Sequence, residues 1–169
     1  MVFCPTKYTG NLALNIANEK PAFFFCLLAL PALVTLTDIS DTALPLTDLT
    51  KNSMDVAAAD LDKVGDNDLV IACEFCPNFI LINDGSGKFA NESRASLPQK
   101  RHDSEDIAAE DFGRDGDIDL VFVSEDAAVH EYYINDGKGH FTDATANHYK
   151  GENNFMSLDA QFMDLNSDG

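Results

Sequence analysis

The sequence predicts an all-β protein. We expect a partial β-propeller of about two four-stranded antiparallel blades plus the start of a third, after an N-terminal apolar leader. Three observations support this prediction: an internal repeat, apolar runs of strand length, and aspartate-rich loops at matched places in the repeat. The 169 residues are enough for one ordinary domain with a leader.

The N-terminal segment differs in composition from the rest of the chain. Residues 1–37 carry only three charged side chains, and residues 21–37 carry none. This run is shorter than the ~20 apolar residues of a membrane-spanning helix, and it follows a basic residue, as in a secretory signal. We therefore expect residues 1–37 to be a signal peptide-like segment, with an uncleaved anchor or a buried strand or helix as alternatives. A signal would make the protein secreted, periplasmic or cell-surface.

The repeat begins after residue 50. Residues 53–60 match residues 104–111 and, more weakly, residues 157–164. A second block, residues 82–89, recurs as residues 134–141 in the same register. Two blocks that share one period make chance an unsatisfactory explanation. The predicted organisation is a linker or first strand at 38–52 and repeats at 53–103, 104–156 and a truncated 157–169.

The sequence of each repeat predicts about four short strands. The first is the apolar segment 56–59, which precedes an Asp/Gly-rich loop. The second strands, 69–73 and 120–123, are continuous apolar runs, typical of strands buried on both faces. The third strands, 79–82 and 132–134, are β-branched or aromatic. Each meets an Asn-Asp-Gly hairpin turn, after which Phe89 or Phe141 starts the returning strand.

The Asp/Gly-rich loops share the frame Asp-x-Asp/Asn-x-Asp-Gly-x-x-Asp at 60–68, at 111–119 and at the start of a third copy, 164–169. Oxygen ligands at alternate positions of a curled loop converge on one centre, and Ca²⁺ accepts 6–8 such oxygens. The loops are not EF-hands, because position 12 is Ile71 or Phe122 instead of Glu. The simpler alternative is that Asp and Gly are good turn formers. Because the chain stops inside the third loop, we expect a fragment or a truncated gene product.

The second repeat carries the clearest family resemblance. Residues 109–122, followed by residues 134–141, resemble the FG-GAP/VCBS repeat of integrin α-subunit heads and many secreted bacterial proteins. The resemblance covers about residues 53–169. It implies a β-propeller with Ca²⁺ in hairpin loops on one rim, in an extracellular protein. Family roles include adhesion, ligand recognition and service as accessory modules of carbohydrate-active enzymes.

The resemblance also implies a ligand set for Ca²⁺. The residues that match the motif are Asp60, Asp62, Asp68 and the Asp66 carbonyl; Asp111, Asp115, Asp119 and the Asp117 carbonyl; and Asp164, Asn166 and Asp168. Two positions depart from the pattern, because Val64 and Gly113 replace acids. We therefore expect Kd values of ~10⁻⁵–10⁻³ M, as in extracellular modules.

Charge and composition limit the partners. With 29 acidic and 11 basic side chains, the net charge is −18. Nucleic-acid binding is excluded by this charge, and contact with anionic membranes is disfavoured beyond a possible anchor. We expect a calcium-binding extracellular scaffold for binding or adhesion, with an unknown protein or glycan as its ligand. The alternative is the non-catalytic propeller region of a secreted carbohydrate-active enzyme.

No catalytic group stands out in the sequence, so we do not expect an enzyme. No two of the four histidines share a metal-ligand spacing, and no nucleophile motif is present. Cys73 and Cys76 form a Cys-x-x-Cys between two predicted strands, not at a helix start. A local disulfide and two free thiols are both compatible with this placement, which argues against redox catalysis and against zinc.

Overall fold

The computed structural model describes residues 37–45, 49, 52–125, 130–148, 156–163 and 165. The chain divides into two compact units, residues 1–40 and 41–169. All described strands belong to the second unit. The predicted leader lies outside the described residues apart from Thr37. In the described part of the chain, no helix has the length and apolar character needed to cross a bilayer.

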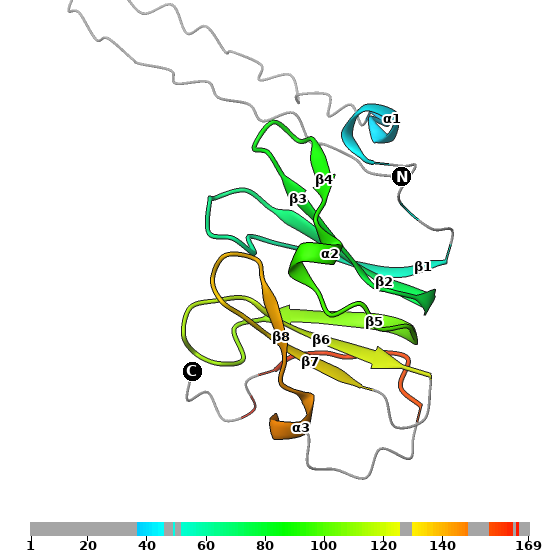
Figure 1. Cartoon of the computed structure of the whole chain (residues 1–169), viewed down its shortest axis with the longest axis vertical. Helices are drawn as coiled ribbons and strands as arrows, with labels where there is room; N and C mark the ends of the chain where they lie inside the picture. The colour runs from blue at the N-terminus through cyan, green and yellow to red at the C-terminus, as the bar shows by residue number, and fades with distance from the viewer. Residues whose placement is uncertain are drawn as a thin grey trace, which may run out of the picture. The chain divides into compact units, whose positions relative to one another are not determined.

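Eight strands form one antiparallel sheet, to which each full repeat contributes a four-stranded blade (Figure 1). The first blade contains β1 (Ser53–Ala59), β2 (Asp68–Cys76), β3 (Phe79–Asn83) and β4 (Phe89–Asn91). The second blade contains β5 (His102–Glu110), β6 (Asp119–Ser124), β7 (Glu131–Asn135) and β8 (Phe141–Asp143). Within each blade every strand pairs with the next one along the chain.

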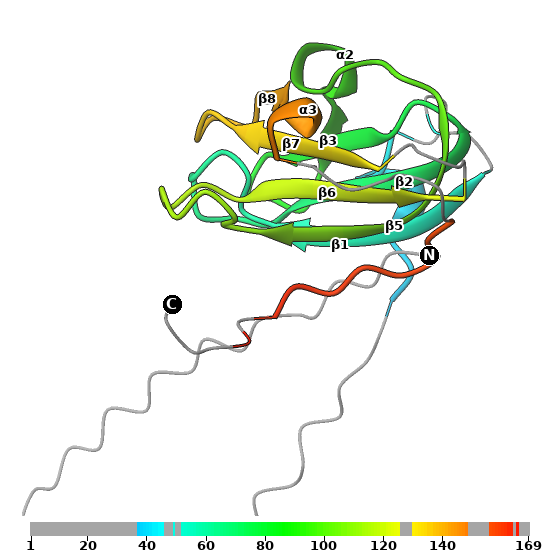
Figure 2. The same ribbon diagram turned by 90° about the horizontal axis from the view of Figure 1, so that it is seen from below.

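The two blades are joined where the end of β2 pairs with the start of β5, through Glu74 and Asp103. Figure 2 shows β1 and β5 along one side of the sheets. The short helices α2 (Ser93–Ser96) and α3 (Thr145–His148) lie on the opposite side, after the last strand of each blade. The all-β prediction is therefore confirmed, and the arrangement is that of a partial β-propeller.

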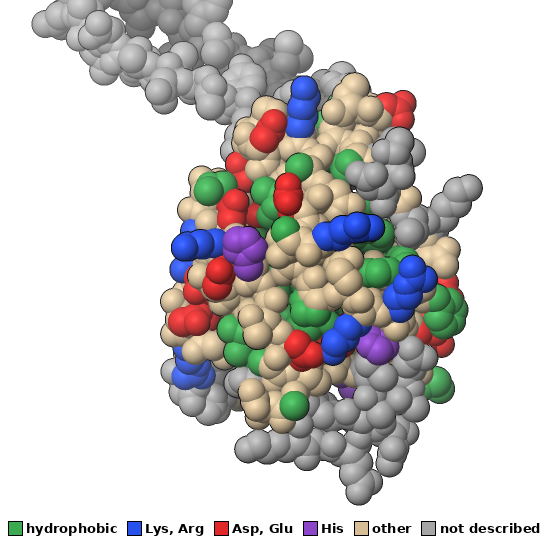
Figure 3. All heavy atoms as spheres, viewed as in Figure 1, with side chains coloured by type: hydrophobic (Ala, Val, Ile, Leu, Met, Phe, Trp, Pro, Cys, Tyr) green, Lys and Arg blue, Asp and Glu red, His purple; other side chains and the backbone are tan. Residues whose placement is uncertain are grey.

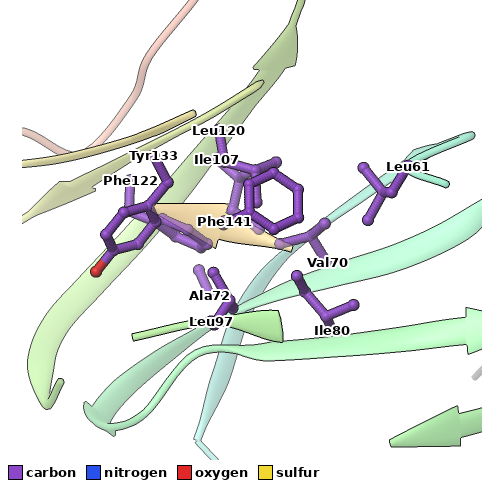
Figure 4. Close-up of a cluster of buried hydrophobic side chains, with 10 residues drawn as sticks. All are labelled: Leu61, Val70, Ala72, Ile80, Leu97, Ile107, Leu120, Phe122, Tyr133 and Phe141. Carbon is purple, nitrogen blue, oxygen red and sulfur yellow. The ribbon is translucent and has the colours of Figure 1, made fainter. Parts of the chain in front are cut away.

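The strands form at the apolar runs, as predicted. A central strand that is covered on both faces needs apolar side chains on both sides, so its sequence is continuously apolar. In β2, four consecutive residues from Val70 to Cys73 are buried. The main core lies between the blades and takes side chains from both (Figure 4). Its members are Leu61, Val70, Ala72, Ile80, Leu97, Ile107, Leu120, Phe122, Tyr133 and Phe141. Burial of each large apolar side chain stabilises the fold by about 1.5–3 kcal/mol, so the two repeats depend on each other.

A smaller core lies in the first blade and contains Ile71, Cys73, Phe79 and Leu81. Leu44 and Leu49, from the segment predicted to be a linker or first strand, pack against it. That segment contains one helical turn, α1 (Ser40–Ala43). Of the two alternatives for the cysteines, the structure has the disulfide, which joins Cys73 to Cys76 at the end of β2.

An aspartate on the first strand of each blade bonds to the following repeat. The Asp55 carboxylate on β1 accepts a hydrogen bond from the backbone N–H of Ile107 on β5, at 3.2 Å. The Asp106 carboxylate on β5 accepts one from the N–H of Ala160, at 2.7 Å. Since Asp55 and Asp106 occupy the same place in successive repeats, the contact is itself repeated.

Candidate metal centre

The first aspartate-rich loop connects β1 to β2. Asp60 follows β1 directly, and Asp68 is the first residue of β2. Asp60, Asp62 and Asp68 each offer a carboxylate oxygen, and these oxygens all lie within 4.8 Å of one another. The structure therefore brings together the three side chains that the sequence predicted as ligands in this loop.

The backbone of the loop curls around these carboxylates. Gly65 adopts φ +96° and Lys63 adopts φ +62°, so two residues have left-handed backbone in one short turn. The N–H of Gly65 donates to Asp60 Oδ2 at 3.1 Å, and the N–H of Val64 donates to Asp62 Oδ1 at 3.2 Å. The glycine supplies the sharp turn that the sequence frame predicted.

Two carboxylate oxygens in this loop are enclosed without a protein hydrogen bond. Among the described residues, Asp60 Oδ1 and Asp66 Oδ1 have neither exposed surface nor a hydrogen-bond partner. A buried polar atom without a partner costs about 1–3 kcal/mol, and more when it is charged. A cation held by oxygen ligands would supply the missing interaction, so the first loop fits a hard metal ion such as Ca²⁺.

Asp68 is completely buried, and its surroundings include groups that raise its pKa and groups that lower it. Burial raises the pKa of Asp68, and the nearby charges of Asp62 and Asp66 act in the same direction. Hydrogen bonds from the N–H groups of Leu61 and Asn83, at 3.0 and 2.8 Å, oppose this effect. The loop therefore concentrates negative charge in a poorly solvated place, which a divalent cation would relieve.

The second loop, between β5 and β6, is built differently. Asp111 uses both carboxylate oxygens to accept N–H groups, from Asp115 at 3.1 Å and from Gly116 at 2.9 Å. Asp119 likewise accepts from Gly113 at 3.0 Å and from Asn135 at 2.9 Å. In the described part of the chain, Asp111, Asp115 and Asp119 do not form a group as close as that of the first loop.

The third residue of each loop, counted from its first aspartate, explains part of this difference. The first loop has Asp62 there, whereas the second has Gly113. A Cβ atom at Gly113 would lie 3.5 Å from carboxylate oxygens of Asp115 and Asp119. Gly113 therefore stands beside the other predicted ligands but supplies no oxygen of its own.

The side chains of Asp66 and Asp117, the seventh residues of the two loops, point toward the hairpin turns. The sequence assigned only the carbonyls of Asp66 and Asp117 to the metal. A Cβ on Gly85 would lie 3.0 Å from Asp66 Oδ2, and one on Gly137 would lie 2.6 Å from Asp117 Oδ1. Each loop is thus packed against the Asn-Asp-Gly turn of its own blade.

Sequence reasoning missed the role of the asparagine in these turns. Asn135 accepts N–H groups of Gly137 and Gly139 on its side-chain oxygen, each at 3.1 Å. Its side-chain nitrogen donates to the carbonyls of Ile118 at 3.0 Å and of Leu61, in the first loop, at 2.8 Å. The only sequence signal was the shared period of the loop and turn motifs.

The two loops lie at the same end of the strands (Figure 2). At this edge of the molecule, acidic and basic side chains lie next to one another (Figure 3). One such contact is an ion pair between Lys63 of the first loop and Asp117 of the second. The predicted ligands Asp164, Asn166 and Asp168 lie outside the described residues.

A second acidic group, which the sequence did not predict, contains Asp103, Glu105 and Glu125. It lies at the start of β5 and beyond the end of β6, away from the loops. Burial raises the pKa of Glu105, and so do the charges of Glu125 and Asp103.

Comparison with known families agrees with this geometry. The family model of the FG-GAP-like repeat matches the chain twice, at residues 60–122 and 111–169. Each match begins at the first aspartate of a loop and includes the strands that follow it. No curated protein matches the chain. Because the two matches together cover well over half of the sequence, the chain belongs to the FG-GAP-like repeat family.

Proposed function

We propose that the protein is a calcium-binding extracellular β-propeller segment that serves as a scaffold for binding or adhesion. The observation that carries this proposal is the convergence of Asp60, Asp62 and Asp68, together with the enclosed Asp60 oxygen that lacks a protein partner. The FG-GAP-like repeat supports it, because calcium binding and an extracellular setting are common in this family.

Asp60, Asp62 and Asp68 would hold the ion in the first loop. All three offer hard oxygen ligands, and the loop has no histidine or cysteine that would favour a transition metal. The bound ion would supply positive charge that offsets the repulsion between the carboxylates. It would thereby fix the connection between β1 and β2 beside the main core.

In this proposal the protein is not itself an enzyme, and its partner is a protein or a glycan. The metal has a structural role, since the buried Asp68 also accepts two backbone N–H groups that hold the loop to β3. A loop that is held rigidly in this way is suited to presenting a binding surface.

Thermal unfolding of the full chain in CaCl₂ and in EDTA tests the proposal. A ligand at about 100 times its Kd stabilises the folded state by ~2.7 kcal/mol, so calcium is expected to raise the Tm. Asp62→Asn removes one ligand charge and is expected to reduce this gain. Glu92→Gln, which neutralises an exposed carboxylate outside the loops, is expected to leave it unchanged. Equal Tm values of the wild-type protein in CaCl₂ and EDTA would contradict the proposal.

A further inference from the structure

Lys63 belongs to the first loop but makes its ion pair in the second. Its ammonium group contacts Asp117 Oδ1, whose side chain is only 15% exposed, whereas that of Lys63 is 50% exposed. The lysine side chain thus leaves its own loop, in which Asp60 and Asp62 are predicted ligands, and reaches the next blade.

The ammonium group lies within the second loop's cluster of charges. A Cβ on Gly116, at the turn of that loop, would be 3.7 Å from Lys63 Nζ. The hydrogen bond with Asp117 raises the pKa of Lys63, and the charges of Asp117, Asp115 and Asp111 add to the effect. Lys63 therefore contacts the carboxylate of Asp117, whose carbonyl was the predicted ligand, and lies near Asp111 and Asp115, whose carboxylates the sequence assigned to a metal.

The backbone at Lys63 is also unusual. A non-glycine residue at φ +62° is uncommon. Arg114, at the same position in the second loop, has φ +56°. Both repeats thus place a basic side chain on left-handed backbone at position 4 of the loop.

We propose that Lys63 is a tethered counter-ion of the second loop, which competes there with Ca²⁺ and makes the first loop the tighter calcium site. This inference rests on the proposed function, since it concerns the affinity of the same family of loops. The reason is electrostatic. An ammonium group fixed beside Asp117 neutralises part of the charge that would attract a divalent ion, and it repels that ion directly.

Terbium luminescence can report on the second loop. Tyr132 lies beside this loop: its ring packs edge-on against the ring of the loop residue Phe112, with 5.6 Å between the ring centroids. Excited tyrosine transfers energy to a nearby Tb³⁺ ion, so the signal of the full chain is expected to rise with occupancy of this loop. Tyr132→Phe is expected to abolish that signal. Competition with CaCl₂ then gives the calcium affinity.

Lys63→Met is the central variant, because it removes the charge and keeps a side chain of similar length. It is expected to tighten Ca²⁺ binding at the second loop by about tenfold, the effect of one unit charge several ångströms from a divalent ion in water. The effect on the trivalent Tb³⁺ ion is expected to be larger, because Coulomb energy grows with the charge of the ion. Lys63→Arg is expected to keep the wild-type affinity. Lys88→Met makes the same charge change in the β3–β4 hairpin and is expected to have little effect.

The possible outcomes separate this inference from the proposed function. If calorimetry shows calcium binding to the wild-type chain but Lys63→Met leaves the Tyr132-sensitised titration unchanged, only the role of Lys63 is overturned. An equal gain in Lys88→Met would also overturn it, because the effect would then come from net charge. Absence of calcium binding in both the wild-type chain and Lys63→Met would overturn both proposals.

Discussion

At the scale of single residues, the contact between the Asp/Gly-rich loop and the hairpin turn depends on glycine. Gly137 has φ +75°, and a Cβ there would lie 2.6 Å from Asp117 Oδ1. Real Cβ atoms do not approach an oxygen so closely, so the aspartate or the turn would have to move. Gly85 stands in the same relation to Asp66 in the first blade, at 3.0 Å.

Gly137→Ala is therefore expected to destabilise the protein by about 2–4 kcal/mol, from backbone strain plus the clash with Asp117. Urea unfolding followed by circular dichroism measures the change. Gly87→Ala is the matched control, since Gly87 has φ +86° but a Cβ there would meet no atom within 4 Å. It is expected to lose only about 1 kcal/mol, from strain alone. Equal losses in the two variants would show that the contact with Asp117 contributes nothing.

At the scale of elements, the end of each blade is fixed by a hydroxyl side chain. Ser93, at the start of α2, accepts the N–H of Ile80 on β3 at 2.9 Å. Thr145, at the start of α3, accepts the N–H of Tyr132 on β7 at 3.0 Å. Asp143, at the end of β8, accepts hydrogen bonds from Thr145 and forms an ion pair with Lys100 at 2.6 Å. Charged as well as neutral hydrogen bonds therefore hold the end of the second blade in place.

The pH dependence of unfolding should reveal the contribution of Asp143. Burial acts to raise its pKa, but Lys100 and Thr145 outweigh burial and lower the pKa to about 2, from an ordinary value of 3.8. A lowered folded-state pKa adds stability above the ordinary value, and this stability is lost as the pH falls from about 4 to about 2. Because the side chain is a third exposed, we expect only about 1 kcal/mol.

Asp143→Asn is expected to remove this part of the acid dependence and to lower stability at neutral pH. Chemical denaturation at a series of pH values between 2 and 7 gives both quantities. Glu92→Gln, at an exposed position, is expected to keep the wild-type slope below pH 4. A wild-type slope in Asp143→Asn would show that the ion pair with Lys100 does not couple to folding.

At the scale of the whole described fold, successive repeats are joined by the shared core and by the aspartates of the first strands. Asp106 receives the N–H of Ala160. Its side chain also interacts with those of Asp55 and Asp159, the equivalent residues of the neighbouring repeats. Burial acts to raise the pKa of Asp106, but these hydrogen bonds lower it overall. The side chains of Asp55, Asp106 and Asp159 therefore form a row that passes through three consecutive repeats.

Asp106→Ala is expected to loosen the third repeat while leaving the two complete blades folded. Loss of a hydrogen bond to a charged acceptor costs about 1.5–3 kcal/mol, so the Ala160 amide should exchange its hydrogen at least about tenfold faster. Hydrogen exchange followed by mass spectrometry, over residues 156–163, measures this rate. Glu105→Ala, on the same strand, is expected to leave it unchanged. An unchanged rate in Asp106→Ala would show that other contacts hold this segment.

The sequence predicted the features that depend on local pattern. Apolar runs such as 69–73 and 120–123 became β2 and β6, and the Asn-Asp-Gly turns led into β4 and β8. The grouping of Asp60, Asp62 and Asp68 also followed from spacing, because the short segment 60–67 must curl to connect the antiparallel strands β1 and β2.

The features that the sequence did not predict depend on contacts between distant residues. The Lys63–Asp117 ion pair and the bond from Asn135 to the Leu61 carbonyl join different repeats, so they require the blades to be placed first. The helices α2 and α3 were missed because four residues are too few to show helical periodicity.

The bond between Asp55 and Ile107 spans 52 residues, one more than the 51 residues of the repeat 53–103. A tandem duplication of one such unit in the gene would bring both the acceptor and the matching donor. Arrays of this kind can therefore gain or lose members by recombination without having to evolve a new junction, whereas insertions of other lengths inside a strand would separate the two partners.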